Sequence, residues 1–149
     1  MTHVLARAGI EDLAARQLYE LLRLRSEVFV VEQDCVYPDL DGRDLEAGTE
    51  HRWAHEADRP EQVLAYLRVL VDPGARRIGR VVTSPAARGR GLAGELVAAV
   101  VTEHGPGTRL VLDAQSHLAD WYARFGFGRD GDDFVEDGIP HTPMARPAG

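Results

Sequence analysis

The spacing of apolar side chains at the start of the chain predicts one short strand and one helix. Residues 3–7 alternate weakly between apolar and polar, as in a half-buried strand. Asp12 then offers a helix cap, and the side chains that follow at helical spacing are Leu13, Leu18, Leu21, Leu22, Arg25, Val28 and Phe29. Arg25 is the one charge in this apolar stripe. It either snorkels from the helix edge or is buried in a pair with one of the acids that follow.

Acids dominate residues 32–61. This stretch holds ten acidic side chains, at positions 32, 34, 39, 41, 44, 46, 50, 56, 58 and 61, against three arginines at 43, 52 and 59. Turn-forming residues at 37–42 indicate a loop. Two interpretations stay open: a solvated charged surface, which is the usual explanation, or a long ordered loop beside a pocket.

The middle of the chain is predicted to contain three strands and a helix. Residues 51–57 and 63–71 have the composition of half-buried strands, with a turn at 58–60 between them. Residues 78–83 form a short β-branched run, and residues 92–104 repeat apolar side chains at helical spacing. The glycines and proline that follow this pattern end the helix.

The C-terminal part has one buried strand and a hairpin in its pattern. Residues 109–114 are almost continuously apolar, as in a buried and partly parallel strand. Residues 117–125 are predicted to form a short helix, and residues 129–136 and 141–146 a final hairpin that turns at Asp137 and Gly138. Pro143 would place the last strand at an edge of the sheet, because proline cannot donate to a strand ladder.

Composition narrows the class of protein. The 149 residues, 44% hydrophobic with a net charge of -7, suit one α/β (α+β) domain over residues 1–149. All 17 cationic side chains are arginine, so a Walker phosphate loop and Schiff-base chemistry are excluded. The single Cys35 has no thiol partner for a disulfide or a metal site. No signal peptide or membrane span is evident, so we expect a cytoplasmic location. The acidic balance disfavours binding to nucleic acid.

A glycine-rich loop precedes the helix at 92–104. Gly79 and Arg80 interrupt the strand before it, Pro85 ends that strand, and Arg88-Gly-Arg-Gly-Leu-Ala-Gly94 follows. Glycines at a helix start let the backbone approach a ligand, and the free N–H groups of the first turn favour an anion. From residue 73 to 94 there are five arginines and no acid, in an otherwise acidic chain. The stretch is therefore predicted to bind an anionic ligand, and the alternative is a plain loop with solvated arginines.

Two families use such a loop. Gly89, Gly91 and Gly94 fit the dinucleotide pattern G-x-G-x-x-G, and Asp113 lies near the place of a ribose-binding acid. Arg88, Gly91 and Ala93 resemble the pyrophosphate loop Q/R-x-x-G-x-G/A of the GCN5-related N-acetyltransferases (GNAT). Spacing favours the second family, since a dinucleotide loop starts at the strand end and needs many strand–helix repeats after it. Only 55 residues follow Gly94.

Further segments strengthen the second resemblance. Residues 120–127, with Trp121 and Tyr122 before Phe125-Gly-Phe, are similar to the segment that closes GNAT domains. Residues 25–37, Asp41 to Asp44, His51 and the run Glu136-Asp-Gly-Ile-Pro-His141 resemble the ElaA subfamily of this superfamily. These matches run from residue 18 to residue 146 and thus cover nearly the whole chain.

The resemblance implies a fold and a cofactor site. The fold would be a mixed, mostly antiparallel sheet of six to seven strands, splayed at its centre and flanked by about four helices. Acetyl-CoA, as acyl-donor cosubstrate, would lie in the splay between strands 78–83 and 110–114. The cofactor-binding residues would be Val81, Val82, Thr83, Arg88, Gly89, Arg90, Gly91, Leu92, Ala93 and Gly94.

The resemblance also assigns a catalytic acid. Tyr122 matches the family's tyrosine beside the thioester sulfur, where a protonated phenol can donate to a leaving thiolate. The alternative is a plain core aromatic. The base is chosen by residue type alone from Glu32, His51 and His117, with Asp113 and His141 as further candidates and a water relay as the alternative. No spacing of ligand residues supports a metal site.

We therefore expect an acetyl-CoA-dependent N-acetyltransferase that acts on a primary amine of a small molecule or peptide by direct attack in a ternary complex. An acyl-homoserine-lactone-synthase-like enzyme and a non-catalytic acyl-CoA-binding module are the alternatives, and a dehydrogenase is a distant one. Acidic stretches at 32–61 and 130–137 would attract a cationic acceptor. A homodimer is compatible with the sequence, which does not determine the oligomeric state.

Overall fold

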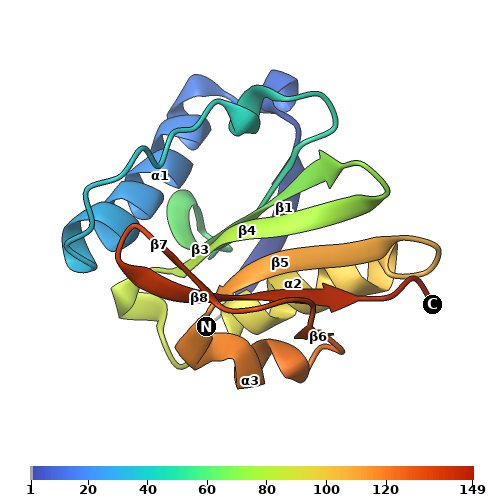
Figure 1. The fold of residues 1–149 in the computed structure, drawn as a ribbon. Coiled ribbons are helices and arrows are strands. Elements are labelled where there is room, and N and C mark those ends of the chain that lie inside the picture. Colours follow the sequence, from blue (N-terminus) through green and yellow to red (C-terminus); the bar gives the residue numbers. More distant parts are fainter. Residues whose placement is uncertain (1) are drawn as a thin grey trace.

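The chain is built around one mixed β-sheet, described over residues 2–149 of a computed structural model (Figure 1). Its strands lie in the order β1-β2-β3-β4-β5-β8-β6, and β7 pairs with β8. All pairs are antiparallel except β4–β5. The strands are β1 (His3–Ala8), β2 (Glu50–Glu56), β3 (Arg59–Asp72), β4 (Ala75–Thr83), β5 (Arg109–Gln115), β6 (Gly128–Arg129), β7 (Phe134–Glu136) and β8 (Ile139–Arg146). The predicted fold class is confirmed, with eight strands in place of six to seven.

Three α-helices cover the sheet: α1 (Ala15–Arg25), α2 (Leu92–His104) and α3 (Ala119–Ala123). A π-helical segment, Ser26–Glu32, continues α1 and takes the place of a fourth helix. The predicted helix over 92–104 has these same bounds. Among residues 2–149, no helix is long and apolar enough to cross a membrane.

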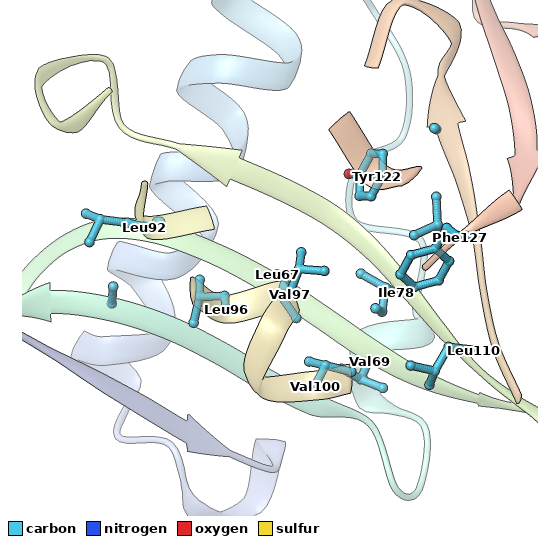
Figure 2. Close-up of a cluster of buried hydrophobic side chains, with 14 of the residues drawn as sticks. Leu67, Val69, Ile78, Leu92, Leu96, Val97, Val100, Leu110, Tyr122 and Phe127 are labelled. Carbon is cyan, nitrogen blue, oxygen red and sulfur yellow. The ribbon is translucent and has the colours of Figure 1, made fainter. Parts of the chain in front are cut away.

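Two apolar cores lie on opposite faces of the sheet, because side chains alternate between the faces along each strand. Tyr66 of β3 belongs to the core beneath α1, together with Leu21 and Trp53. The next residue, Leu67, belongs to the core beneath α2 and α3, together with Leu96 (Figure 2). Helix α2 thus packs on one face of the central strands, while α1 holds the acidic loop against the other.

Two predicted helix and turn boundaries were wrong. Asp12 does not cap α1, because it closes a short 3-10 turn (Ile10–Asp12) and the extended residues Leu13 and Ala14 separate it from the helix start. The β2–β3 turn contains only Ala57 and Asp58, since Arg59 already pairs with Glu56.

The sequence had predicted that Pro143 lies in an edge strand, and this prediction was wrong. Strand β8 pairs with β5 on one side and with β6 and β7 on the other. Pro143 lies between the short stretches that β6 and β7 cover, and its carbonyl accepts a hydrogen bond from the Asp130 N–H at 2.8 Å. A residue's N–H and C=O point to the same side of a strand, so the missing donor falls where the outer ladder is interrupted.

Candidate active site

The sheet opens at its one parallel pair. Among residues 2–149, residues 75–77 of β4 pair with residues 109–111 of β5, and the two strands are not paired beyond that point. A register shift against β3 marks a bulge next to Arg80, whose φ is 53°. From Ile78 onward, β4 therefore has no strand partner on its β5 side among the described residues. The predicted splay is present, and it leaves a row of backbone donors and acceptors for a ligand to pair with.

A cavity of about 240 Å³ lies at this opening. Strand β4 contributes Ile78 to Val81 and β5 contributes Leu112, Asp113 and Gln115. The far wall comes from the segment after the π-helical turn and from the β7–β8 hairpin, and its residues include Gln33, Cys35, Tyr37, Glu136, Asp137 and His141. Segments more than 100 residues apart in sequence thus meet around one space.

The glycine loop has the geometry of an anion site. Gly89 and Gly91 have φ values of 88° and 74°, and a Cβ atom at either position would meet nothing within 4 Å. Gly91 caps α2, and the first intrahelical bond runs from Glu95 N–H to Gly91 C=O. The N–H groups of residues 92–94 precede that bond, so they are free to bind a phosphate at the positive end of the helix dipole.

Gly94 lies beside the α3 region. A Cβ atom there would lie 3.5 Å from Phe125 and 3.8 Å from Trp121, both in the α3 region. Both distances are ordinary van der Waals contacts, so a methyl group at position 94 would fit beside the segment that carries Tyr122.

The two loop arginines already have partners. Arg88 donates through both Nη atoms to the Glu32 carboxylate, with Nη1 to Oε2 at 3.0 Å. These hydrogen bonds lower the pKa of Glu32. Arg90 donates to Glu56 at 3.0 Å. An incoming phosphate would therefore compete with Glu32 for Arg88, and Glu32 lies at the loop rather than in the cavity.

Tyr122 stands where the cavity meets the core. Its side chain is only 6% exposed, yet it lines the cavity, and no hydrogen bond engages its hydroxyl among residues 2–149. Trp121 packs edge-on against its ring at 4.9 Å, and the hydroxyl points away from Phe127 (Figure 2). Burial raises the pKa of the phenol, which keeps it protonated as a donor.

The structure separates the base candidates that residue type alone could not. His51 is 0% exposed, its Nδ1 lies 2.7 Å from the Tyr66 hydroxyl, and its Nε2 lies 3.1 Å from the Asp44 carbonyl. Burial thus separates His51 from any substrate and also lowers its pKa. His117 is exposed and lies outside the cavity lining. His141 does line the cavity, although it had been only a secondary candidate.

Asp113 also lines the cavity, but its carboxylate accepts a hydrogen bond from Arg77 at 3.1 Å. No group of three or more potential metal ligands occurs among residues 2–149.

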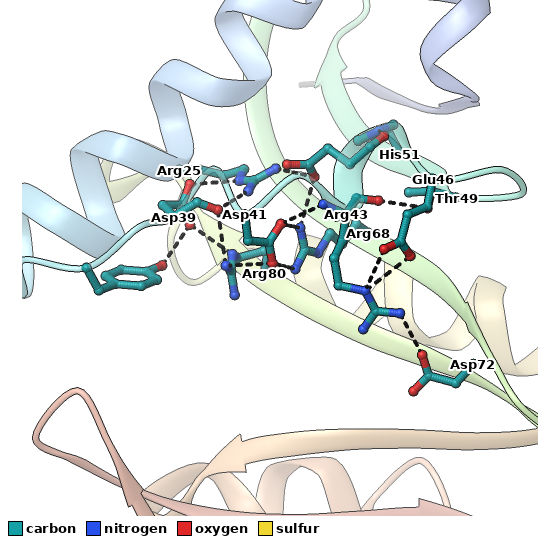
Figure 3. Close-up of polar contacts among 12 residues, drawn as sticks. Arg25, Asp39, Asp41, Arg43, Glu46, Thr49, His51, Arg68, Asp72 and Arg80 are labelled. Carbon is teal, nitrogen blue, oxygen red and sulfur yellow. Dashed lines mark hydrogen bonds and ion pairs between the residues drawn. The ribbon is translucent and has the colours of Figure 1, made fainter.

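The acidic loop is ordered by arginines (Figure 3). Arg25, which is 0% exposed, donates to Asp39 at 3.0 Å and to Asp44 at 2.7 Å. Arg68 donates to Asp41 at 2.6 Å and lowers its pKa. Of the two alternatives for Arg25, burial in a pair with the following acids is therefore correct, and snorkelling from the helix edge is not. The loop is an ordered wall of the cavity rather than a solvated acidic surface.

These features fit a CoA thioester, whose pyrophosphate needs an anion site and whose pantetheine arm needs backbone partners. The open glycine cradle supplies the first and the unpaired side of β4 supplies the second. Val81, Val82 and Thr83 lie on that stretch of β4, although the buried Val82 side chain belongs to the core beneath α1. Contact with such a ligand would come from their backbone.

Comparison with known proteins agrees with this geometry. The family model described as an acetyltransferase (GNAT) domain matches residues 15–147. A UPF0039 protein of Mycobacterium tuberculosis is 49% identical over 99% of this chain and 95% of its own length. The crystal structure of Escherichia coli ElaA superposes with a TM-score of 0.88 at 37% identity, and covers 97% of this chain and 99% of that one.

Two other solved structures have a similar fold, one at higher and one at much lower sequence identity. An acyl-CoA N-acyltransferase from Pseudomonas aeruginosa is 41% identical, with a TM-score of 0.86 over 97% of this chain and 99% of that one. The AHL synthase LasI has a TM-score of 0.73 over 97% of this chain and 89% of its own length, at 15% identity, a likeness of fold alone. By its loop, its splayed sheet and its near full-length relatives, the chain belongs to the GNAT family of acyltransferases, in the ElaA-like group.

Proposed function

We propose that this acyltransferase moves an acetyl group from acetyl-CoA to a primary amine of a small molecule or peptide, by direct attack in a ternary complex. The observation that carries the proposal is the cavity at the splay, which joins the unpaired side of β4 to the Tyr122 hydroxyl. A volume of about 240 Å³, shared between acyl group and acceptor, suits a short acyl chain.

Each part of the site has a task in this reaction. The N–H groups of residues 92–94 bind the pyrophosphate, and Arg88 adds charge once it leaves Glu32. Backbone groups of Val81 to Thr83 align the pantetheine arm and polarise the thioester carbonyl, as an oxyanion hole does. Tyr122 donates its proton to the sulfur as the carbon–sulfur bond breaks.

A cationic acceptor suits the cavity. Asp39, Asp41 and Asp44 are neutralised by arginines, so they do not supply the attraction that the sequence had suggested. Glu136 and Asp137, at the tip of the β7–β8 hairpin, line the cavity and form no ion pair among residues 2–149. Their two charges are the ones available to an ammonium group.

Thermal unfolding with acetyl-CoA, CoA and NAD in parallel, followed by a thiol-release assay with a panel of amines, tests the proposal. Acetyl-CoA at 100 times its Kd should stabilise the fold by about 2.7 kcal/mol, and NAD should not. Stabilisation by NAD alone would refute acyl-CoA use. Stabilisation by acetyl-CoA without thiol release for any amine would instead indicate a binding module. Release that requires acyl-carrier protein and S-adenosylmethionine would indicate a lactone synthase.

A further inference from the structure

His141 occupies a defined place in the cavity wall. It lies in β8, opposite Gln115 at the end of β5 on one side and opposite Phe134 of β7 on the other. Its ring stacks on Phe134 at 5.5 Å with an interplanar angle of 18°. The side chain is half-buried and shares the cavity with Tyr122. Strand pairing on both sides therefore fixes the histidine backbone, and the stacking limits the freedom of its ring.

One hydrogen bond sets the tautomer of this ring. His141 Nδ1 lies 2.8 Å from the Ile139 carbonyl oxygen. A carbonyl only accepts, so Nδ1 carries the proton and donates it. In the neutral ring Nε2 then keeps its lone pair, and no described residue engages it. A half-buried imidazole in a cavity wall, with an unengaged lone pair, is equipped to take a proton.

The other histidines lack this combination. All six histidines of the chain lie within residues 2–149, and only His141 lines the cavity. His51 uses both ring nitrogens inside the core. His55 has the same kind of bond, with Nδ1 2.8 Å from the Glu56 carbonyl, but it lies on β2 outside the cavity. His55 is therefore a matched control for His141.

We propose that His141 is the general base of the reaction, an inference that rests on the proposed transfer of an acyl group to an amine. The amine nitrogen forms its bond to the thioester carbon, and the carbon–sulfur bond breaks. His141 Nε2 accepts the proton that the amine loses, while Tyr122 gives its proton to the departing sulfur. The products are the amide and the free thiol. Exchange with solvent returns the His141 proton to the Tyr122 phenolate, which restores both groups.

Several charged and titratable groups share the cavity with His141. The acids are Asp41, Asp113, Glu136 and Asp137, the arginines are Arg43, Arg68, Arg77 and Arg80, and Cys35, Tyr37 and Tyr122 complete the set. Ion pairs among the arginines and the first two acids leave Glu136 and Asp137 as the unpaired charges. They stand on the same hairpin as His141.

The first test is the pH dependence of kcat/KM for the wild type, H141Q and H55Q. General-base catalysis contributes about 10²- to 10⁴-fold, so H141Q should lose about 10²-fold or more near neutral pH. The acidic limb of the kcat/KM profile should disappear in H141Q. A limb that stays at the same pH for amines of different basicity belongs to the free enzyme and not to the amine. H55Q should keep both rate and limb. An H141Q profile parallel to that of the wild type, with a similar rate, would overturn the proposal.

A second test needs no turnover. Nitrogen NMR of the ligand-free wild type should show His141 protonated at Nδ1 and unprotonated at Nε2 in its neutral form. The opposite tautomer would overturn the proposal even if H141Q fails to fold. H141Q should bind acetyl-CoA as tightly as the wild type does, because His141 is not part of the proposed cofactor-binding loop. A wild-type protein that transfers no acyl group would refute the proposed function, whereas a competent wild type with an equally competent H141Q would refute only the base.

Discussion

Tyr66 and Tyr122 show how surroundings decide what one side-chain type does. Both rings are buried, and burial raises the pKa of both phenols. The Tyr66 hydroxyl contacts His51 at 2.7 Å and Arg25 at 3.5 Å inside the core, so it is committed to structure. Among residues 2–149 the Tyr122 hydroxyl has no hydrogen-bond partner, and the residue lines the cavity. The same phenol is therefore a structural bridge in one place and an available proton donor in the other.

Replacing each tyrosine by phenylalanine should give opposite effects. Y122F should lower kcat by about 10²-fold with little change in acetyl-CoA affinity, because the hydroxyl acts only as charge builds on sulfur. Y66F should lower the free energy of unfolding by about 1–3 kcal/mol, because it leaves a buried partner unsatisfied. Steady-state kinetics and urea unfolding check both. An unchanged kcat in Y122F, when chemistry limits turnover, would remove Tyr122 as the acid.

His51 should make stability depend on pH. Burial lowers the folded-state pKa of His51. Below about pH 6.5 this histidine therefore binds a proton in the unfolded chain while it is still neutral in the folded chain. The stability is therefore complete above the ordinary histidine pKa and is lost as pH falls through the lowered folded-state value. Urea unfolding between pH 8 and pH 5 should show this loss in the wild type and a flatter profile in H51Q. An H51Q profile as steep as that of the wild type would contradict the assignment.

At the scale of elements, α1 positions the cavity wall through its last residue. Arg25 ends the helix, and its guanidinium binds Asp39 and Asp44 of the following loop (Figure 3). The π-helical segment between them lies beside the glycine loop through Glu32 and Arg88. One helix and its π-helical extension thus contact both the cavity wall and the glycine loop.

Removing the buried arginine should be costly. R25A removes one of the two arginine partners of each buried carboxylate, Asp39 and Asp44, and should lower the free energy of unfolding by about 3–5 kcal/mol. R23A removes an exposed arginine two residues earlier and should change it by no more than about 0.5 kcal/mol. Urea unfolding compares the two. Equal and small losses would mean that the network contributes little to the fold.

The glycine loop allows strain and ligand binding to be separated. Gly91 and Gly107 have φ values of 74° and 87°, and a Cβ atom at either would meet nothing within 4 Å. G91A and G107A should therefore each lower the free energy of unfolding by a similar amount, about 1–2 kcal/mol, through backbone strain. Only G91A should also weaken acetyl-CoA binding, because its methyl group fills the phosphate cradle. Calorimetric titration measures the affinity, and equal affinities in the two variants would contradict a cofactor role for the loop.

At the scale of the whole molecule, a net charge of -7 conceals an uneven distribution. In the loop after α1, Asp39, Asp41 and Asp44 pair with arginines 25, 68 and 80, whereas the acids at the tip of the β7–β8 hairpin form no ion pair among residues 2–149. The field at the cavity mouth therefore comes from the hairpin. Composition alone suggested a broad acidic rim. Among residues 2–149, Glu136 and Asp137 are the acids that both line the cavity and lack an ion pair.

This distribution predicts a salt-sensitive preference for cationic amines. The double variant E136Q/D137N should raise KM for a diamine by about threefold to tenfold and leave KM for a neutral-tailed amine unchanged. D58N/E61Q makes the same change of charge at exposed acids outside the cavity and should have no such effect. Added salt should weaken the preference of the wild type. A preference that resists salt would remove the electrostatic explanation.

Local patterns in the sequence predicted most of the elements and the glycine loop. The helix over 92–104, the buried strand after it and the turn at Asp137 and Gly138 follow from local periodicity and turn chemistry. The glycine loop was recognisable because free backbone N–H groups at a helix start depend on a linear spacing and need no help from distant residues. The motif around residues 120–127 was recognisable from the spacing of its aromatic residues and glycine.

Tertiary structure alone decided which side chains share a space. Arg25 meets acids 14 and 19 residues away, and Arg88 meets Glu32 across 56 residues. His51, His117 and His141 are equivalent by type, and only strand register and packing put the first in the core, the second on the surface and the third in the cavity. The run that ends in His141 was the available signal, but it marked a family segment and not a base. Burial and proton affinity depend on distant neighbours, and a local pattern holds no information about them.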